Sequence, residues 1–474
     1  MSVNRLAALI QGNLRHEPTS QQRKAMLEFA SFITCRQSHT MMIMRGCAGT
    51  GKTTLAAAIV RTMAEMNQRI ILMAPTGRAA KVLSLNAGMP AYTIHRRIYR
   101  QKSIDQGLSG FMLNVNTGRD ILFVVDEASM IANSGFADSG FGSGRLLDDL
   151  VQFVYGGANC RLMLIGDKAQ LPPVGEEESP ALMRQVMESY GMQVFEADLT
   201  EVLRQSENSG ILYNATMIRR LITHDQITQL PKISITAFAD IHVVRGDELI
   251  EQLASSYSQV GIDDTIVVTR SNKRANIYNQ GIRNMILGRE EVLCATDMLM
   301  VVKNNYHWTE HDRESPMPFI ANGDRARVVR VRNHRSLYGF SFADITVAFM
   351  DYDNYEITVT TILDSLSSDS PSLTREQHET LFNAVMEDYA DISPKSERMR
   401  KLKEDIYYNA LQIKYAYAVT CHKAQGGQWS HVYIDQGYMS DDMLTPDYIH
   451  WLYTAFTRAT EQLYLVNWPK EQTL

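Results

Sequence analysis

The chain has 474 residues, of which 45% are hydrophobic and 21% are charged, and both fractions are typical of globular proteins. This length accommodates roughly three domains of the usual size, each with its own core. The formal net charge of −6 argues against a protein that coats nucleic acid with its whole surface. The sequence has neither an apolar run of transmembrane length nor a convincing signal peptide, so we expect no membrane partner.

The cysteine pattern bears on the compartment. Five cysteines lie far apart, and their number is odd. Their spacing matches neither a metal site nor a disulfide framework. We therefore expect a cytoplasmic, reducing environment. The residues are Cys35, Cys47, Cys160, Cys294 and Cys421.

Residues 46–53 read Gly-Cys-Ala-Gly-Thr-Gly-Lys-Thr and directly follow an apolar run at residues 41–44. This order of strand, glycine loop and helix predicts a P-loop that binds a nucleoside triphosphate, and it disfavours a chance glycine turn. Backbone N–H groups would surround the phosphates, Lys52 would neutralise the β and γ phosphates, and Thr53 would offer a hydroxyl to Mg²⁺. The predicted nucleotide ligands in the loop are Gly46, Ala48, Gly49, Thr50, Gly51, Lys52, Thr53 and Thr54.

Short apolar runs alternate with helical patterns along much of the chain. This alternation predicts βαβ units around parallel sheets, with ligands bound where the strands end. Two sets of runs, one before and one after about residue 215, predict two α/β halves. The runs lie at residues 70–74, 121–125, 161–165, 266–269, 432–434 and 463–466.

Residues 99–119 lack a long period and contain three glycines, so they predict a hairpin inserted in the first half. A basic cluster overlaps its start. The cluster is compatible with phosphate binding, and a solvated face is the simpler alternative. Its members are Arg96, Arg97, Arg100 and Lys102.

Two acidic residues, Asp126 and Glu127, follow the apolar run at residues 121–125. We expect Asp126 to hold Mg²⁺, mostly through water, and Glu127 to position or deprotonate the attacking water. An acidic pair at a strand end is common, but a P-loop about 75 residues upstream favours the catalytic interpretation over a solvated strand end.

Residues 166–174 place polar groups at another strand end and continue into a rigid Pro-Pro turn. The amide of Gln170 is suited to contact a γ phosphate without competing for the metal. An ordinary turn is the alternative.

The pattern changes after Asn322. Short β-rich segments at residues 326–331, 342–350 and 356–362 predict a small barrel, followed by a polar linker at 365–373 and charged helical sequence at 374–411. Arginines alternate in the first of these segments, so one strand face is expected to be strongly basic. The arginines are Arg325, Arg327, Arg330, Arg332 and Arg335.

Taken together, six motifs in order resemble the superfamily 1 helicases, specifically the RecD-like branch, superfamily 1B, which includes the Dda-like phage enzymes. The resemblance covers residues 19–466. Short motifs arise by chance singly, whereas six in family order do not. The late motif departs from the family in having Ala424 where serine is common, and residues 374–411 have no counterpart that we can name. The motifs occupy residues 74–80, 93–96, 166–174, 199–205, 419–426 and 452–459.

The resemblance assigns roles to further residues. Arg204 and Arg458 would act as arginine fingers on the γ phosphate, although each alone is more typical of a surface or salt-bridged arginine. Gln22 would read adenine, and with Thr19 it also fits a capping box. Phe111 would be the aromatic tip of the hairpin, with a core aromatic as the alternative. The expected contacts with single-stranded DNA are Thr76, His95, Phe111, Pro172, Thr420 and His422.

The resemblance implies an α/β fold with two RecA-like P-loop motor domains on parallel sheets, a small hairpin in the first, and an SH3-like β-barrel with a helical segment in the second. We expect domain 1A at residues 1–215 with insertion 1B at about 96–120. Domain 2A would comprise residues 216–320 and 412–474, and the inserted domain 2B residues 321–411.

The implied function is an ATP-dependent DNA helicase that uses ATP and Mg²⁺ and moves 5′ to 3′ on single-stranded DNA. Polarity comes from the resemblance alone. An ATP-gated DNA clamp or assembly factor without unwinding remains an alternative, as does an RNA helicase, because contacts to the 2′-OH cannot be placed. We expect a monomer that acts at duplex junctions, with DNA-repair, recombination or replication proteins as possible partners. No nuclease-like metal cluster is evident in the sequence, so strand cleavage is not expected.

Overall fold

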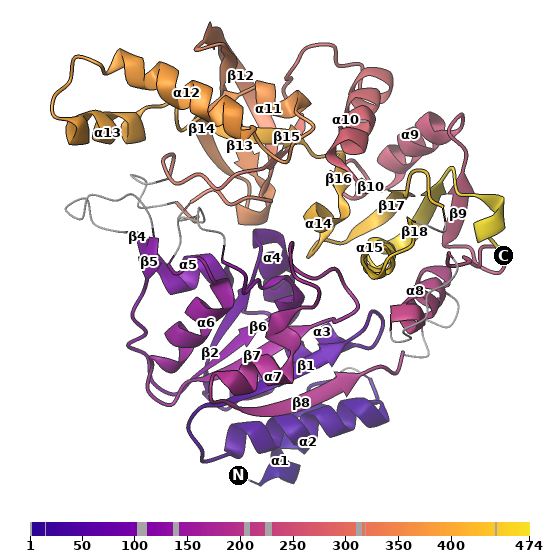
Figure 1. The fold of residues 1–474 in the computed structure, drawn as a ribbon. Helices are drawn as coiled ribbons and strands as arrows, with labels where there is room; N and C mark the ends of the chain where they lie inside the picture. The colour runs from indigo at the N-terminus through magenta and orange to yellow at the C-terminus, as the bar shows by residue number, and fades with distance from the viewer. Residues whose placement is uncertain are drawn as a thin grey trace.

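The computed structural model contains two parallel sheets and a closed barrel (Figure 1). This arrangement, with a hairpin attached to the first sheet, confirms the expected fold class. Among the residues described, no helix is both long enough and apolar enough to span a membrane. The structure describes residues 2–14, 16–101, 111–135, 142–202, 209–222, 230–309, 315–317, 319–440 and 443–474.

The first sheet has six parallel strands in the order β3-β2-β6-β7-β1-β8. The runs predicted at residues 41–44, 70–74, 121–125 and 161–165 all form strands here, whereas β8 was not predicted. The bounds are β1 (Thr40–Gly46), β2 (Arg69–Ala74), β3 (Ala91–Thr93), β6 (Ile121–Val125), β7 (Arg161–Gly166) and β8 (Gln193–Leu199).

Alternate side chains of each strand enter different cores, because strand side chains point to opposite faces in turn. Met42 and Met44 of β1 pack with the first four helices, whereas Met41 and Ile43 pack on the opposite face. The first layer contains α1 (Val3–Gly12), α2 (Ser20–Thr34), α3 (Lys52–Glu65) and α4 (Gly77–Ala87); the second contains α5 (Ile94–Ile98), α6 (Leu146–Tyr155), α7 (Arg184–Ser189) and the turns η2 (Ala128–Met130) and η3 (Pro180–Leu182).

The predicted hairpin is present as the antiparallel pair β4 (Tyr99–Gln101) and β5 (Phe111–Leu113). Its connecting residues, 102–110, lie outside the described residues.

The second sheet has five parallel strands in the order β16-β10-β17-β18-β9. Its strands are β9 (Ile241–Val244), β10 (Thr265–Thr269), β16 (Ala418–Thr420), β17 (Trp429–Asp435) and β18 (Ala459–Val466). The accompanying helices are α8 (Gly210–Ile222), α9 (Leu249–Gln259), α10 (Asn272–Gly281), the π-helical turn η5 (Ile282–Ile286), α14 (Cys421–Ala424), α15 (Pro446–Phe456) and the turn η8 (Lys470–Gln472).

Helix α8 places the domain boundary earlier than predicted. Ile211, Ala215 and Ile218 are buried in the core of the second sheet. The Asp240 carboxylate just before β9 accepts a hydrogen bond of 2.7 Å from the Gly210 N–H at the start of this helix. A boundary at 215 would divide a helix that packs as one unit, so we place it between residues 202 and 210.

The barrel is larger than the three predicted β segments. Strands β11 (Met298–Val301) and β15 (Leu411–Tyr415) flank β12 (Arg325–Leu337), β13 (Phe340–Phe349) and β14 (Tyr355–Ile362) and close it. Strand β11 lies within residues 216–320, and nearly all of β15 lies within residues 412–474, both of which were assigned to domain 2A. The barrel therefore extends beyond the predicted bounds of domain 2B, because these two strands close it. The turn η6 (Met350–Tyr352) joins β13 to β14.

The charged segment after the barrel forms α11 (Asp364–Ser367), α12 (Arg375–Asp388) and α13 (Lys395–Glu404). Leu381, Val385 and Leu402 pack with Phe340 and Phe342 of the barrel in a separate small core. This contact explains how mostly charged helices are held at the end of the barrel (Figure 1).

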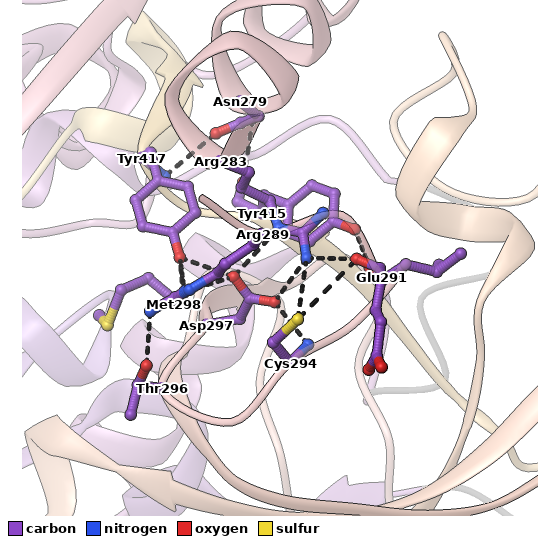
Figure 2. Close-up of polar contacts among 11 residues, drawn as sticks. Asn279, Arg283, Arg289, Glu291, Cys294, Thr296, Asp297, Met298, Tyr415 and Tyr417 are labelled. Carbon is purple, nitrogen blue, oxygen red and sulfur yellow. Dashed lines mark hydrogen bonds and ion pairs between the residues drawn. The ribbon is translucent and has the colours of Figure 1, made fainter. Parts of the chain in front are cut away.

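A buried polar network joins the barrel to the second sheet (Figure 2). The fully buried Asp297 carboxylate accepts hydrogen bonds from Arg283 at 3.0 and 3.1 Å and from Arg289 at 2.6 Å. The Tyr417 hydroxyl donates to the same carboxylate at 2.8 Å. Arg283 precedes the barrel in the chain and Tyr417 follows it. The network therefore joins the segment that enters the barrel to the segment that leaves it.

Candidate nucleotide site and nucleic-acid track

The P-loop joins the end of β1 to the start of α3. Gly49 and Gly51 have φ of +75° and +73°, a left-handed conformation that glycine adopts without strain. A Cβ on Gly46 would lie 3.0 Å from Thr50 Oγ1, so this position requires a close approach. Lys52 Nζ donates a hydrogen bond of 3.0 Å to the Gly46 carbonyl. The loop is thus closed on itself, with its lysine at the phosphate-binding turn.

Gln22 lies beneath this loop. Its side chain completes the predicted capping box with Thr19, and its Nε2 donates a hydrogen bond of 3.0 Å to the Thr50 carbonyl. Gln22 is fully buried. The side chain therefore connects the start of α2 to the P-loop, while its adenine-reading role stays a prediction.

The acidic pair lies at the end of β6. Burial and the charge of Glu127 together raise the pKa of Asp126 to about 6, against the opposing charge of Lys52. Glu127 has a φ of +52°, and its Oε2 is buried without a hydrogen-bond partner among the described residues. Oxygen ligands of this kind are those that Mg²⁺ prefers, so Asp126 and the Thr53 hydroxyl at the start of α3 fit a magnesium site.

Polar groups after β7 complete this edge of the sheet. Asp167 is buried, and burial raises the pKa of its carboxyl, with the charge of Lys52 opposing the shift. Gln170 is also buried, and its Oε1 has no hydrogen-bond partner in the described part of the chain. Both Gln170 and Glu127 thus present an unpaired acceptor, as expected of groups that position water or phosphate.

The second sheet contacts this edge through α15. The Tyr453 hydroxyl donates to Asp167 Oδ2 at 2.6 Å and accepts a hydrogen bond of 3.0 Å from the Ala48 N–H in the P-loop. The Leu171 N–H donates to Thr454 Oγ1 at 2.8 Å. The P-loop and the segment after β7 therefore meet the second sheet directly.

The expected DNA-binding motifs also meet between the sheets. Thr76 caps α4, with its hydroxyl accepting from the Ala79 N–H at 3.2 Å. A Cβ on Gly426, whose φ is +76°, would lie 3.2 Å from Thr76 Oγ1. Arg78 stacks on Trp429 with its guanidinium carbon 4.5 Å from the ring centre. Early and late motifs, about 350 residues apart, thus form one surface.

Comparisons with known proteins agree with this geometry. The model of a family described as AAA domain matches residues 18–230, and that of the UvrD-like helicase C-terminal domain matches residues 415–466. The ATP-dependent RecD2 DNA helicase of Deinococcus radiodurans is 29% identical over 42% of this chain and 24% of its own length. The ATP-dependent DNA helicase dda of Enterobacteria phage T4 is 24% identical over 66% of this chain and 67% of its own. These matches support a helicase of superfamily 1B.

The relatives differ in how much of their own length the chain covers. Protein R530 of Acanthamoeba polyphaga mimivirus is 24% identical over 94% of the chain and 98% of its own length, whereas the chain spans about a quarter of RecD2. Among solved structures, the Pif1 helicase from Bacteroides in complex with ADP-AlF3 and ssDNA has a TM-score of 0.48 at 16% identity, covering 96% of this chain and 94% of that one.

Of the two arginines expected to act as arginine fingers, the structure describes one. Arg204 lies outside the described residues. Arg458 is buried, and its guanidinium donates hydrogen bonds of 3.0 Å each to Thr454, Gly427 and Thr457, which lie on α15 and on the loops beside the second sheet. Three local acceptors hold the side chain here, and its role as an arginine finger stays a prediction.

Arg219 of α8 contacts the nucleotide site instead. Its guanidinium hydrogen-bonds Cys47 Sγ in the P-loop, and the charge of Asp167 acts on it. The sequence contained no signal for this contact, because a helical arginine outside any motif has no distinctive spacing. Tyr453 lay within a recognised motif but had no assigned role.

Phe111 is not an exposed tip. It is buried in the first position of β5, opposite Gln101, with its ring centre 4.8 Å from that of Tyr306 and 5.8 Å from that of Phe319. The alternative of a core aromatic is the correct one, because the side chain packs on the segment that joins β11 to β12. Residues at the hairpin tip are outside the described ranges.

The remaining predicted DNA contacts lie at element ends. His95 lies at the start of α5 against Phe319, and burial lowers its pKa to about 4, so it is neutral at physiological pH. Thr420 is the cap residue of α14, and the next residue but one, His422, is exposed. Pro172 is buried beside Leu171, where the two sheets meet. Their contacts with DNA stay predictions.

Proposed function

We propose that this superfamily 1B helicase hydrolyses ATP between its two RecA-like domains, moves 5′ to 3′ along single-stranded DNA and unwinds duplex at junctions. The observation that carries the proposal is the Tyr453 hydroxyl, which bonds both the P-loop and Asp167 from the other domain. A group bound in the P-loop would alter this contact directly. In this proposal the first motor domain ends near residue 202 and carries hairpin 1B. The second motor domain, 2A, begins at about residue 209, and the barrel with its helices is inserted within it.

The chain's own residues would divide the chemistry as follows. Lys52 exchanges its Gly46 acceptor for phosphate oxygens, and the Ala48 N–H exchanges Tyr453 for the same group. Mg²⁺, held through Asp126 and Thr53, would supply charge neutralisation on the β and γ phosphates. Glu127 orients and deprotonates the attacking water, and Gln170 contacts the γ phosphate.

This exchange links chemistry to movement. Because the Ala48 N–H of the P-loop donates to the Tyr453 hydroxyl, a phosphate bound by this N–H would compete with one contact between the domains. A ligand shifts a conformational equilibrium only by the difference in its affinity for the two states. ATP and its products would differ in how they compete with this contact at the P-loop. Turnover would therefore alternately open and close the cleft across which the strand lies.

Single-stranded DNA is the proposed substrate, with Thr76, His95, Pro172, Thr420 and His422 along its path. Short polar side chains and helix starts bind phosphates without reading sequence. A clamp that hydrolyses ATP without unwinding is the main alternative from another class, and RNA is the alternative substrate. The reducing compartment, the monomeric state and DNA-repair or replication partners stay predictions from the sequence.

Strand displacement tests the proposal. Matched duplexes carry a 5′ or a 3′ single-stranded DNA tail, and Glu127→Gln serves as the inactive control. Displacement from the 5′ tail alone is the expected result. Displacement from the 3′ tail would contradict the polarity, and DNA-stimulated hydrolysis without displacement from either tail would favour the clamp. A 5′-tailed RNA duplex unwound in preference to DNA would identify an RNA helicase.

A further inference from the structure

Two lysine side chains line one small pocket where the second RecA-like domain meets the barrel. The pocket lies between α10, the barrel strands β11 and β15, and the late motif that begins at Thr420. Its polar lining consists mainly of Asn272, Asn276, Lys414, Thr420 and Lys423. Sequence analysis assigned a role only to Thr420 among these.

The positive charges of this pocket are weakly compensated. Lys414 is 8% exposed, and its Nζ donates to the Ser368 carbonyl. Lys423 Nζ donates to the side-chain oxygen of Asn322. Both acceptors are uncharged, and Asp369, an exposed residue, is the acid whose charge acts on Lys414. Two partly buried lysines therefore line the pocket, and only uncharged acceptors bond their ammonium groups.

The pocket wall is held in place by the network of Figure 2. Asn279 Nδ2 donates to the carbonyls of Tyr415 and Ala418 at 3.3 and 2.9 Å. Its Oδ1 accepts from the N–H groups of Tyr417 and Ala418 at 3.1 and 2.8 Å. The backbone between Lys414 and Thr420 is thus fixed before any ligand binds, which lowers the entropic cost of binding.

We propose that the Lys414–Lys423 pocket binds one backbone phosphate of single-stranded DNA at the boundary between the second RecA-like domain and the barrel. The proposal rests on the proposed function, whose DNA path includes Thr420. A phosphate has one negative charge and several acceptor oxygens, which match two ammonium groups, a hydroxyl and the amides of Asn272 and Asn276. The pocket would couple the barrel to the strand held by the motor.

Proton linkage distinguishes this site from an ordinary surface contact. Burial lowers the pKa of Lys414 and of Lys423 to about 8, and the charge of Lys414 contributes to the shift of Lys423. A bound phosphate favours the charged amines and raises both pKa values. The affinity for DNA is therefore highest below pH 8 and falls as the pH rises above 8, with Asp369 partly opposing the effect.

The experiment measures anisotropy of a labelled oligo(dT) with the full chain, over a salt series at pH 7 and a pH series from 7 to 9.5. Lys414→Gln removes the charge, and Lys414→Arg keeps it at every pH tested. Lys395→Gln removes an exposed charge from α13 and is the matched control. Thermal unfolding of each variant checks the fold.

We expect Lys414→Gln to bind oligo(dT) about tenfold more weakly at pH 7, the loss typical of one charge-assisted hydrogen bond. The slope of log affinity against log salt should fall in magnitude by about 0.7, the value for one phosphate on a single strand. Lys414→Arg should keep the wild-type slope and show a smaller decline with pH.

Equal affinity, slope and pH profile for Lys414→Gln and Lys395→Gln would overturn the proposal. A second outcome would also overturn it: inorganic phosphate stabilises wild type but not Lys414→Gln against heat, while both proteins bind DNA equally. The pocket would then bind a free anion and not the strand. A wild-type protein that does not bind oligo(dT) at all would instead contradict the proposed function.

Discussion

Tyr453 of the second domain donates a hydrogen bond of 2.6 Å to Asp167 of the first, and it also accepts one from the P-loop N–H of Ala48. All of Tyr453 is buried, and burial raises the pKa of its hydroxyl well above the usual value, so it remains a donor at every physiological pH. A single hydroxyl of the second domain thus contacts both the P-loop and Asp167, so a change in the P-loop alters a contact between the domains.

Tyr453→Phe should therefore destabilise the nucleotide-free protein. The change removes one donor to a buried carboxylate, and a buried polar group left unpaired costs about 1–3 kcal/mol. Thermal and urea unfolding measure the loss. Tyr438→Phe, at a side chain that is 82% exposed, is the control and should change little. Equal effects of the two substitutions would show that the bridge contributes nothing to stability.

Lys52→Ala and Glu127→Gln should each abolish DNA-stimulated ATP turnover, with a loss of at least about 100-fold, as expected when a positioned acid–base or phosphate-binding group is removed. Steady-state phosphate release measures it, and unfolding curves check that the fold is retained. Lys24→Ala, an exposed residue on α2, should be close to wild type. Normal turnover in either site variant would remove our assignment of the catalytic site.

Asp297→Ala should be the most destabilising single change at the junction of the barrel and the second sheet. It leaves Arg283 and Arg289 without their shared carboxylate, and breaking a buried ion pair costs about 3–5 kcal/mol. Asp247→Ala breaks an exposed ion pair with Arg245 and should cost about 1 kcal/mol or less. A loss at Asp297 no larger than that at Asp247 would contradict the structural role of the network in Figure 2.

Asp324 should make stability depend on pH. Burial raises the pKa of its carboxyl to about 7, with a further contribution from the charge of Asp351. The folded protein therefore holds a proton that the unfolded chain releases near pH 4. This contribution to stability is fully present at low pH and is lost as the pH rises through about 7.

Asp324→Asn keeps an acceptor for the Ala321 N–H and removes the titration. Stability should then depend less on pH between 5 and 7, where one such proton contributes up to about 1.4 kcal/mol per pH unit. Unfolding at several pH values measures the difference. Asp353→Asn, at an exposed turn, should retain the wild-type profile; the same flattening there would indicate a general charge effect.

Local patterns predicted much of the first sheet. The glycine loop before Lys52 requires a strand behind it and a helix after it, and the apolar runs around it alternate with the period of a parallel α/β fold. The apolar run at residues 121–125 likewise predicted that Asp126 and Glu127 lie at the end of a strand, and they follow β6. These signals are visible in sequence because each depends on residues close together in the chain.

Other features escaped prediction because their partners are distant. Phe111 lies in a segment that predicts an exposed hairpin tip, yet Tyr306 and Phe319, about 200 residues later in the chain, pack on it. The flanking strands of the barrel are short and resemble the α/β strands beside them, so only closure identifies β11 and β15. Arg219 has no motif, and its contact with Cys47 depends on how α8 packs.

The sequence by itself determined the nucleotide chemistry, the α/β class and the order of the family motifs, since phosphate binding and strand patterning depend on short-range spacing. The tertiary structure decided how the two domains meet. Tyr453 at the P-loop, Arg458 held by its own domain, and Lys414 beside Lys423 all result from long-range packing. Burial then sets which of these groups are charged, because the cost of charge depends on surroundings that no local pattern specifies.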